Sequence, residues 1–281
     1  MPGRSSGRAA VRAALALTGA LAAASATAAE GPLALARISL VEPRVERSAG
    51  RTKWQPAAEG APLKTGEALR TGPDGTARLE LPWMSLTLGP GAALRFPDEA
   101  VLSATHESGR ALIEAPDRDA LKLVTPEAEV YGRGRAVVRR EGRSTTVSCL
   151  DGRFHVASPR GAVTLAPGQG TVARAGRAPA PASSLPAAPR DGLWPAGDPV
   201  YVAAGAPLEL RWSGDAASYQ VELLPVGADI VLLQRDVATA ALRIEVPWEG
   251  AFRWRVSARD GRGVEGAPSD EGLIAVEPRQ D

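Results

Sequence analysis

The residue types that most often carry out chemistry are scarce in this chain, and they do not gather in the patterns that catalysis or metal binding needs. Histidine occurs twice, as His106 and His155, and cysteine once, as Cys149. Metal sites usually need three or four ligands at short, telling spacings, and none cluster here. We therefore expect both histidines to be solvated or hydrogen-bonded, and we predict no metal ion and no other cofactor.

Acidic residues do occur in close pairs, which in glycosidases can supply an acid and a base or nucleophile. The pairs are Asp117/Asp119, Glu127/Glu129 and Asp270/Glu271. They have no helix or cleft to aim them, and no G-x-S-x-G turn offers a serine nucleophile. The glycine-rich stretches 89–93 and 132–134 lack the Lys-Ser/Thr of a phosphate loop, so we expect turns there. The sequence predicts no catalytic residues and a protein that is not an enzyme.

The six tryptophans leave a choice between packing and binding. Trp212 and Trp254 alternate with aliphatic residues and are expected in a core, whereas the other four lie beside turns or prolines: Trp54, Trp83, Trp194 and Trp248. An exposed indole can stack on a sugar or fill a partner's pocket. The alternative is local packing that closes the ends of the β domains. If a surface binds, the predicted partner-binding residues are Trp83 in the first half and Trp248 in the second.

The elements that would position these residues are short strands. In TGPDGTARLEL (71–81), a turn rich in Pro, Asp and Gly precedes residues that alternate between apolar and polar. A two-residue period is typical of a strand that is buried on one face. Similar segments recur with turn signals about every 8–12 residues, among them Asp151-Gly152, which predicts an all-β fold.

Charge and cysteine content exclude several classes of partner. The chain has 33 basic and 32 acidic residues, so no net field would collect nucleic acid or an anionic membrane surface. We expect no nucleic-acid partner. A lone cysteine forms no internal disulfide, and Cys149 alternates with Val147 on a predicted strand. We expect Cys149 to be a small buried residue, with an intermolecular disulfide as the alternative.

The N-terminus has the pattern of a secretory signal peptide. Arg4, Arg8 and Arg12 precede an alanine-rich apolar stretch at 13–24, and Ala26-Thr27-Ala28 offers a cleavage site. We predict a signal peptide over residues 1–29 and a periplasmic or secreted protein with no integral membrane span after cleavage. An uncleaved anchor helix is the alternative, although the apolar stretch is short for a span.

The remainder divides into two β domains. Residues 34–175 form one pattern, which is typical of a sandwich, barrel or short solenoid. Residues 176–190 are rich in Pro, Ala and Ser and are expected to be a linker. Residues 191–281 contain roughly seven strands with the spacing of an immunoglobulin-like sandwich.

Residues 37–172 resemble the periplasmic domain of the FecR family. The segments that carry the resemblance are LKTGEALRTGPDGTARLEL (63–81), SLTLGPGAALRF (85–96), LKLVTPEAEVYGRG (121–134) and TTVSCLDGRFHVAS…GAVTLAPGQG (145–170). The family usually has Gly-Thr and an aromatic residue where this chain has Gly134-Arg135-Ala136-Val137. The resemblance implies a FecR-like β-sandwich or solenoid-like domain outside the cytoplasm.

Residues 191–278 look like a fibronectin type III domain. The segment LELRWSGDAASYQVELL (208–224) is similar to strands B and C of that family, and EGAFRWRVSARDGRGVEGAPS (249–269) to strand F and the loop that follows. Phe252 stands where the family more often has tyrosine.

Together these features predict an exported binding or scaffolding protein of the bacterial cell envelope. Its partners would be an envelope protein or peptidoglycan, met through sheet edges and loops. The alternative is a component of FecR-type trans-envelope signalling that acts through a membrane partner. FecR regulators have a cytosolic segment and a spanning helix before this domain, and a signal peptide at the start of this chain leaves no room for them. Regulation is therefore not carried over directly.

Overall fold

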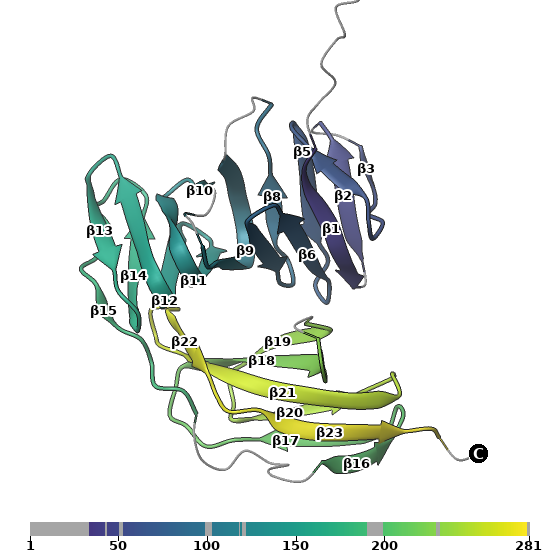
Figure 1. The fold of residues 1–281 in the computed structure, drawn as a ribbon. Helices are drawn as coiled ribbons and strands as arrows, with labels where there is room; N and C mark the ends of the chain where they lie inside the picture. Colours follow the sequence, from purple (N-terminus) through teal and green to yellow (C-terminus); the bar gives the residue numbers. More distant parts are fainter. Residues whose placement is uncertain are drawn as a thin grey trace, which may run out of the picture. The chain divides into compact units, whose positions relative to one another are not determined.

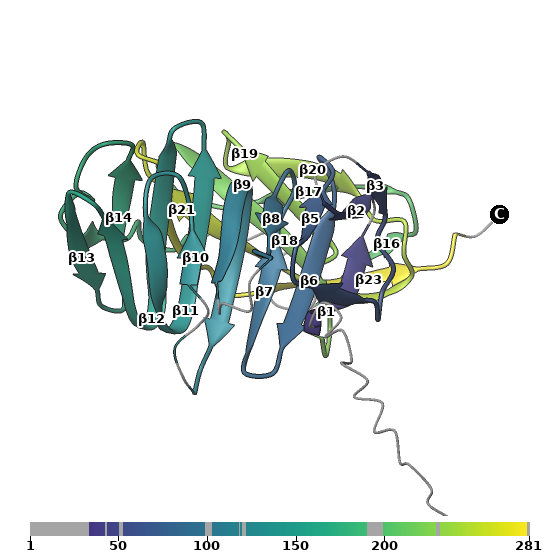
Figure 2. The same ribbon diagram turned by 90° about the horizontal axis from the view of Figure 1, so that it is seen from above.

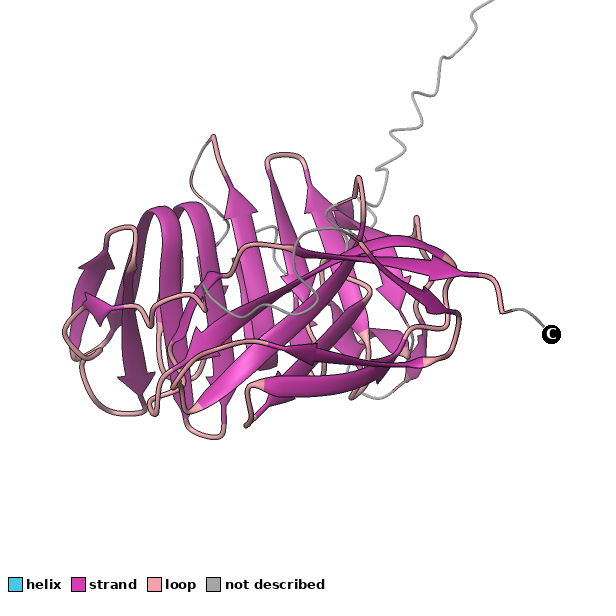
Figure 3. Cartoon of the chain, turned by 90° about the horizontal axis from the view of Figure 1, so that it is seen from below, coloured by secondary structure: helices cyan, strands magenta, loops and turns pink. Residues whose placement is uncertain are grey.

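The computed structural model describes residues 34–42, 44–50, 53–98, 103–117, 119, 122–189, 199–228 and 231–279. Every regular element among them is a β-strand (Figure 3), so the predicted all-β class is confirmed. No helix that could cross a membrane occurs within these ranges. The predicted signal peptide, residues 1–29, lies outside the described residues.

The first β region, strands β1–β15, is one continuous 15-stranded hydrogen-bonded sheet. Its strands are β1 Ala34–Glu42, β2 Val45–Ala49, β3 Trp54–Pro56, β4 Pro62–Lys64, β5 Glu67–Thr71, β6 Thr76–Leu81, β7 Met84–Leu88, β8 Ala93–Arg95, β9 Ser103–Ala115, β10 Lys122–Val124, β11 Glu129–Glu141, β12 Ser144–Ser158, β13 Gly161–Leu165, β14 Gln169–Arg174 and β15 Ser183–Ser184.

This sheet bends over on itself, so that its two parts enclose one core (Figures 1 and 2). Layer I contains β2, β3, β5, β8, β10 and β13, and layer II contains β1, β4, β6, β7, β14 and β15. The long strands β9, β11 and β12 run through both layers. The beginning of β9 pairs with β8 and β10, and its end pairs with β7 and β11. The first half of β12 pairs with β14 and its second half with β13.

Glycines lie where the long strands pass from one layer to the other. Gly109 in β9 has φ 78°, Gly134 in β11 has φ 105° and Gly152 in β12 has φ 76°, values that residues with a Cβ avoid. The predicted turns at 132–134 and 151–152 are therefore wrong. The chain bends at these glycines but stays paired along β11 and β12, because glycine permits the bend without ending the ladder.

The core of the first region is built from the alternating apolar residues that the sequence pattern singles out. Leu79, Leu86, Phe154 and Val156 are fully buried between the layers, and burying a side chain of this size contributes about 1.5–3 kcal/mol. Cys149 is also fully buried, as predicted. Burial, together with the charge of Asp151, raises the pKa of its thiol to about 11.

The second β region has the two facing sheets of an immunoglobulin-like sandwich. Strands β16-β23-β21-β18-β19 form one sheet, with β22 added to β21, and β17 pairs with β20 in the other. The strands are β16 Val200–Ala203, β17 Pro207–Arg211, β18 Ser218–Pro225, β19 Leu233–Val237, β20 Ala241–Glu245, β21 Gly250–Arg259, β22 Glu265–Pro268 and β23 Gly272–Glu277.

Aromatic residues fill the centre of this sandwich. Trp254 is fully buried, and its ring centroid lies 6.2 Å from that of Trp212. Tyr219 meets Trp212 edge-on with centroids 5.4 Å apart. The prediction that both tryptophans are core residues is confirmed, and the aromatic cluster supplies the large apolar area that a small β domain needs.

The segment predicted as a linker is partly ordered against layer II. Ser183 and Ser184 form β15, which pairs with Gln169 and Gly170 of β14. Thr171 Oγ1 donates a hydrogen bond to the carbonyl of Ala180 at 2.6 Å. The chain therefore runs along the edge of this layer before it enters the second region. The exact domain boundaries stay a prediction.

The bend in β12 can be tested with matched glycine substitutions. Gly152 and Gly168 share φ 76°, but a Cβ at Gly152 would lie 2.1 Å from the carbonyl oxygen of Arg133, whereas at Gly168 it would meet nothing within 4 Å. Gly168→Ala should cost about 1–2 kcal/mol of unfolding free energy through backbone strain alone. Gly152→Ala should cost a further 1–3 kcal/mol, roughly, through the clash. Urea unfolding measures both, and equal losses would contradict the described crossing.

Candidate functional site

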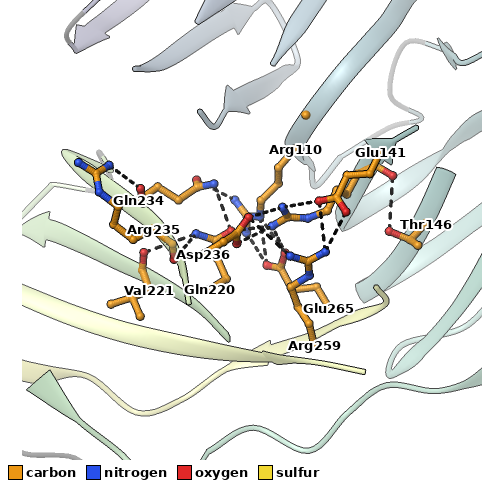
Figure 4. A network of polar contacts seen from close by, with 12 residues as sticks. Arg110, Glu141, Thr146, Gln220, Val221, Gln234, Arg235, Asp236, Arg259 and Glu265 are labelled. Carbon is orange, nitrogen blue, oxygen red and sulfur yellow. Dashed lines mark hydrogen bonds and ion pairs between the residues drawn. The ribbon is translucent and has the colours of Figure 1, made fainter. Parts of the chain in front are cut away.

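A buried ion network joins the two β regions, and its centre is Glu265 at the start of β22 (Figure 4). The Arg110 guanidinium donates to both oxygens of the Glu265 carboxylate, with Nη2 2.8 Å from Oε1 and Nε 3.0 Å from Oε2. Arg139 Nη2 lies 3.3 Å from Oε2 of the same group. The three residues are 4%, 5% and 2% exposed, in the order Arg110, Arg139, Glu265. A carboxylate of the second region is thus held between two arginines of the first.

Further charged residues complete what we call the Glu265 network. Arg110 Nη1 lies 3.1 Å from Glu222, and Arg139 Nη1 lies 2.8 Å from Asp236. The ion-paired members are four arginines and four carboxylates, so the network is electrically balanced: Arg110, Arg139, Arg255, Arg259, Glu141, Glu222, Asp236 and Glu265. Gln220 and Gln234 accept further hydrogen bonds from the arginines. Balance matters here because an unpaired buried charge is very costly.

The charges shift one another's proton affinities. Burial by itself would lower the pKa of Arg110, but Glu265 and Glu222 outweigh it and raise that pKa. Burial would raise the pKa of Glu265, but Arg110 and then Arg139 hold it below its usual value. Both groups therefore stay ionised at neutral pH, as a stable buried pair requires.

Two flat sheet faces bring these side chains together. Arg110 and Arg139 are cross-strand partners on the outer face of layer II. They meet the polar face of β18 and β19, and the backbone N–H of Glu265 donates to Ser148 Oγ at 3.1 Å. No motif in the sequence indicated this network. The one sequence signal is Arg110, which occupies a strand position directly before the apolar residues 111–113.

A shallow groove opens on layer I beside β3, across the neighbouring ends of β3, β2 and β5. It has a volume of about 570 Å³, and its lining is Arg44, Val45, Glu46, Pro56, Ala57, Arg70, Thr71 and Gly72. Arg70 pairs with Glu46 at 2.6 Å and stacks its guanidinium 4.2 Å from the ring centre of Trp54. The lining of the groove thus combines apolar and charged residues.

Arg44 is an exposed cation of this groove. Its φ of 58° is the only positive value among the described non-glycine residues, and such conformations often mark ligand-binding positions. The Gly72 N–H donates to the Arg44 carbonyl at 2.8 Å, and a Cβ at Gly72 would lie 2.9 Å from Arg44 Cβ. Glycine at 72 therefore allows the backbone that presents Arg44. Within the described residues, its side chain makes no ion pair or hydrogen bond.

The predicted partner-binding tryptophans, Trp83 and Trp248, are both half-buried. Trp83 packs against the core of the first region, in the turn between β6 and β7. Trp248 packs against the second core, with its ring centre 6.5 Å from that of Phe252. The structure does not bring them together with the groove residues, and their role in binding stays a prediction. Trp194 lies outside the described residues.

The two histidines occupy opposite environments. His106 is fully buried, and its Nε2 lies 2.9 Å from the Gly109 carbonyl, so Nε2–H donates to that oxygen. Burial lowers the pKa of His106 from 6.5 to about 4. His155 is half-buried on the outer face of layer I, where its Nδ1 lies 2.9 Å from Thr164 Oγ1. The histidines were predicted to be solvated or hydrogen-bonded, and each ring makes a hydrogen bond.

The acidic pairs do not converge on a common site. Glu127 is buried against Arg140 and Thr145, whereas its neighbour Glu129 faces outward and pairs with Lys122 at 2.9 Å. In the described ranges, no cluster of three or more His, Cys, Asp or Glu side chains is arranged to hold a metal ion.

Comparison with known proteins assigns no family to this chain. No protein-family model and no curated protein matches it. Among solved structures, a "putative anti-sigma factor" from Parabacteroides distasonis aligns over 42% of this chain and 59% of its own, with 19% identity and a TM-score of 0.35. The match therefore spans less than two thirds of that protein. Titin domains A168–A170 align over 83% of this chain and 88% of their own, with 13% identity and a TM-score of 0.27.

Similarity at this level does not establish function. At these identities and TM-scores, neither neighbour establishes a family for this chain. The resemblance to the FecR and fibronectin type III families stays a prediction.

The Glu265 network can be tested by removing its central anion. Glu265→Ala leaves Arg110 and Arg139 buried without their shared partner, which should cost about 3–5 kcal/mol of unfolding free energy. Glu209→Ala breaks an exposed pair with Arg211 and should have no measurable effect. Urea unfolding compares the two variants, and similar stabilities would show that the network is open to water.

His106 should make stability depend on pH. Its folded pKa is depressed, so the unfolded chain takes up a proton first as the pH falls. The contribution of neutral His106 to the free energy of unfolding is complete above the pKa of the unfolded chain, roughly 6.5. It should be lost at about 1.4 kcal/mol per pH unit as the pH falls toward 4. His106→Gln should remove this slope between pH 6 and 5, a window that lies above the range where Glu265 titrates. An unchanged slope in unfolding experiments would contradict a buried neutral histidine.

Proposed function

We propose that this is an exported, non-enzymatic binding or scaffolding protein of the bacterial cell envelope, and that the groove beside β3 receives a protein partner. The observation that carries the proposal is Arg44, an exposed cation without an ion pair among the described residues, held in a strained backbone conformation beside apolar groove residues. Strain of this kind persists where the surrounding structure enforces it, and it often serves binding.

The groove favours an extended segment that carries a carboxylate. Val45, Pro56 and Ala57 offer apolar contact, while Arg44 offers a planar guanidinium that suits bidentate recognition of a carboxylate. Glu46 is already engaged by Arg70, so it does not neutralise Arg44. Among the described residues, strand β3 pairs only with β2, which leaves its other edge free for a partner strand.

The Glu265 network supports a scaffold rather than a reactive centre. Three of the ionisable groups whose pKa is shifted, Arg110, Arg139 and Glu265, are engaged in joining the two β regions. A perturbed group in a cleft would favour an enzyme, whereas these groups lie between packed sheets.

Site-specific crosslinking in the native envelope tests the proposal. A photoreactive residue at position 57, in the groove, should capture a defined protein. A probe at position 209, on the exposed strand β17, should not capture it. Arg44→Asn removes the cation but keeps a residue that tolerates positive φ, and it should lower the yield roughly tenfold. Arg44→Lys should recover part of it.

The outcomes separate the alternatives. Capture that is unaffected by Arg44→Asn would reject the groove as the binding site. Capture of a membrane-spanning partner would favour FecR-type signalling. Retention of the chain in the cytoplasmic fraction, with residues 1–29 intact by mass spectrometry, would reject an exported protein.

A further inference from the structure

A second surface, on the outer face of layer I, combines an aromatic pair with two cations. Tyr131 of β11 and His155 of β12 are directly opposite each other, with ring centroids 5.2 Å apart and planes inclined by 25°. The hydrogen bond between His155 Nδ1 and Thr164 Oγ1 orients the imidazole. Tyr131 is 37% exposed, so part of its ring remains open to solvent.

The next cross-strand pair on the same face of these two strands is Arg133 and Arg153. Both side chains are exposed, and neither makes an ion pair or hydrogen bond within the described residues. The nearest acid along β12, Asp151, pairs with neither. Like charges directly opposite each other destabilise a sheet, so this pair carries a cost that the isolated chain does not compensate.

A bound anion would remove that cost. Two guanidinium groups on neighbouring strands can share one carboxylate through charge-assisted hydrogen bonds. The aromatic pair lies two residues away along each strand, which is about 7 Å. The spacing suits a ligand that has a ring to stack on Tyr131 and a carboxylate to reach Arg133 and Arg153.

We infer that this face is a binding site for an acidic saccharide, distinct from the groove beside β3. A sugar ring packs against Tyr131, its carboxylate lies between Arg133 and Arg153, and Thr164 with His155 Nε2 is placed to meet hydroxyl groups. A saccharide fits better than a peptide strand, because most of β11 and β12 is paired on both sides, and the aromatic pair and the two arginines lie on a sheet face rather than along an edge.

Calorimetric titration of the purified full chain tests the inference. Oligogalacturonate provides a carboxylate on each ring, and a maltooligosaccharide of equal length is the neutral control. We expect the first to bind and the second not to bind. Tyr131→Ala and Arg153→Ala should each weaken the affinity roughly tenfold or more. Arg160→Ala, which removes an exposed arginine in the turn between β12 and β13, should not.

A stability measurement gives an independent readout. Arg153→Glu places an opposite charge across from Arg133, so it should raise the thermal midpoint while abolishing binding. A raised thermal midpoint together with lost binding would show that the like-charged pair lowers stability but serves ligand binding. A lowered midpoint would contradict the cost assigned to that pair.

Other outcomes would overturn the site. Failure of oligogalacturonate to bind at millimolar concentration would do so, as would equal binding by poly-glutamate, since that requires charge alone. Normal binding by Tyr131→Ala or Arg153→Ala would have the same consequence. Arg44→Asn should leave oligogalacturonate binding unchanged, so the groove proposal and this one succeed or fail separately.

Discussion

The shared ion pair of Glu265 with Arg110 and Arg139 is the constraint on which the arrangement of the two β regions depends. Each of these groups is almost entirely removed from water. Burying any one alone would be prohibitive, but the electrostatic attraction offsets the desolvation when they meet in good geometry. Any other way of joining the two sheets would leave some of these buried charges unpaired, which is strongly unfavourable. Apolar residues of similar volume could give equal stability without that selectivity.

This constraint divides the surfaces of the first region between two uses. The outer face of layer II, with Arg110, Arg139 and Ser148, is occupied by the second region. The outer face of layer I keeps its charged and aromatic residues in solvent, and the groove at Arg44 opens on the same layer. Arginines on strands therefore have different environments on the two faces. On layer II, Arg110 and Arg139 are structural charges paired with carboxylates, whereas on layer I Arg133 and Arg153 make no ion pair among the described residues.

The long strands explain how one sheet can provide both faces. A strand that continues through a bend carries residues of both layers. Its pairing register in one layer therefore restricts its pairing register in the other. Gly109, Gly134 and Gly152 make the bends possible because a side chain at those backbone angles would be strained, and at each of the three it would also clash. Sequence patterns could not distinguish these glycines from ordinary turns, because both uses place glycine between two alternating segments.

The amino-acid sequence alone determined the all-β class, the buried alternating residues, the burial of Cys149, and the core positions of Trp212 and Trp254. These depend on a two-residue period that is written in neighbouring residues. Only the tertiary structure decided that 151–152 is a bend inside a strand, that Arg110 meets Glu265, and that Arg133 faces Arg153. Arg110 and Glu265 are 155 residues apart. Such a pairing depends on how whole sheets fold and pack, and no local pattern encodes it.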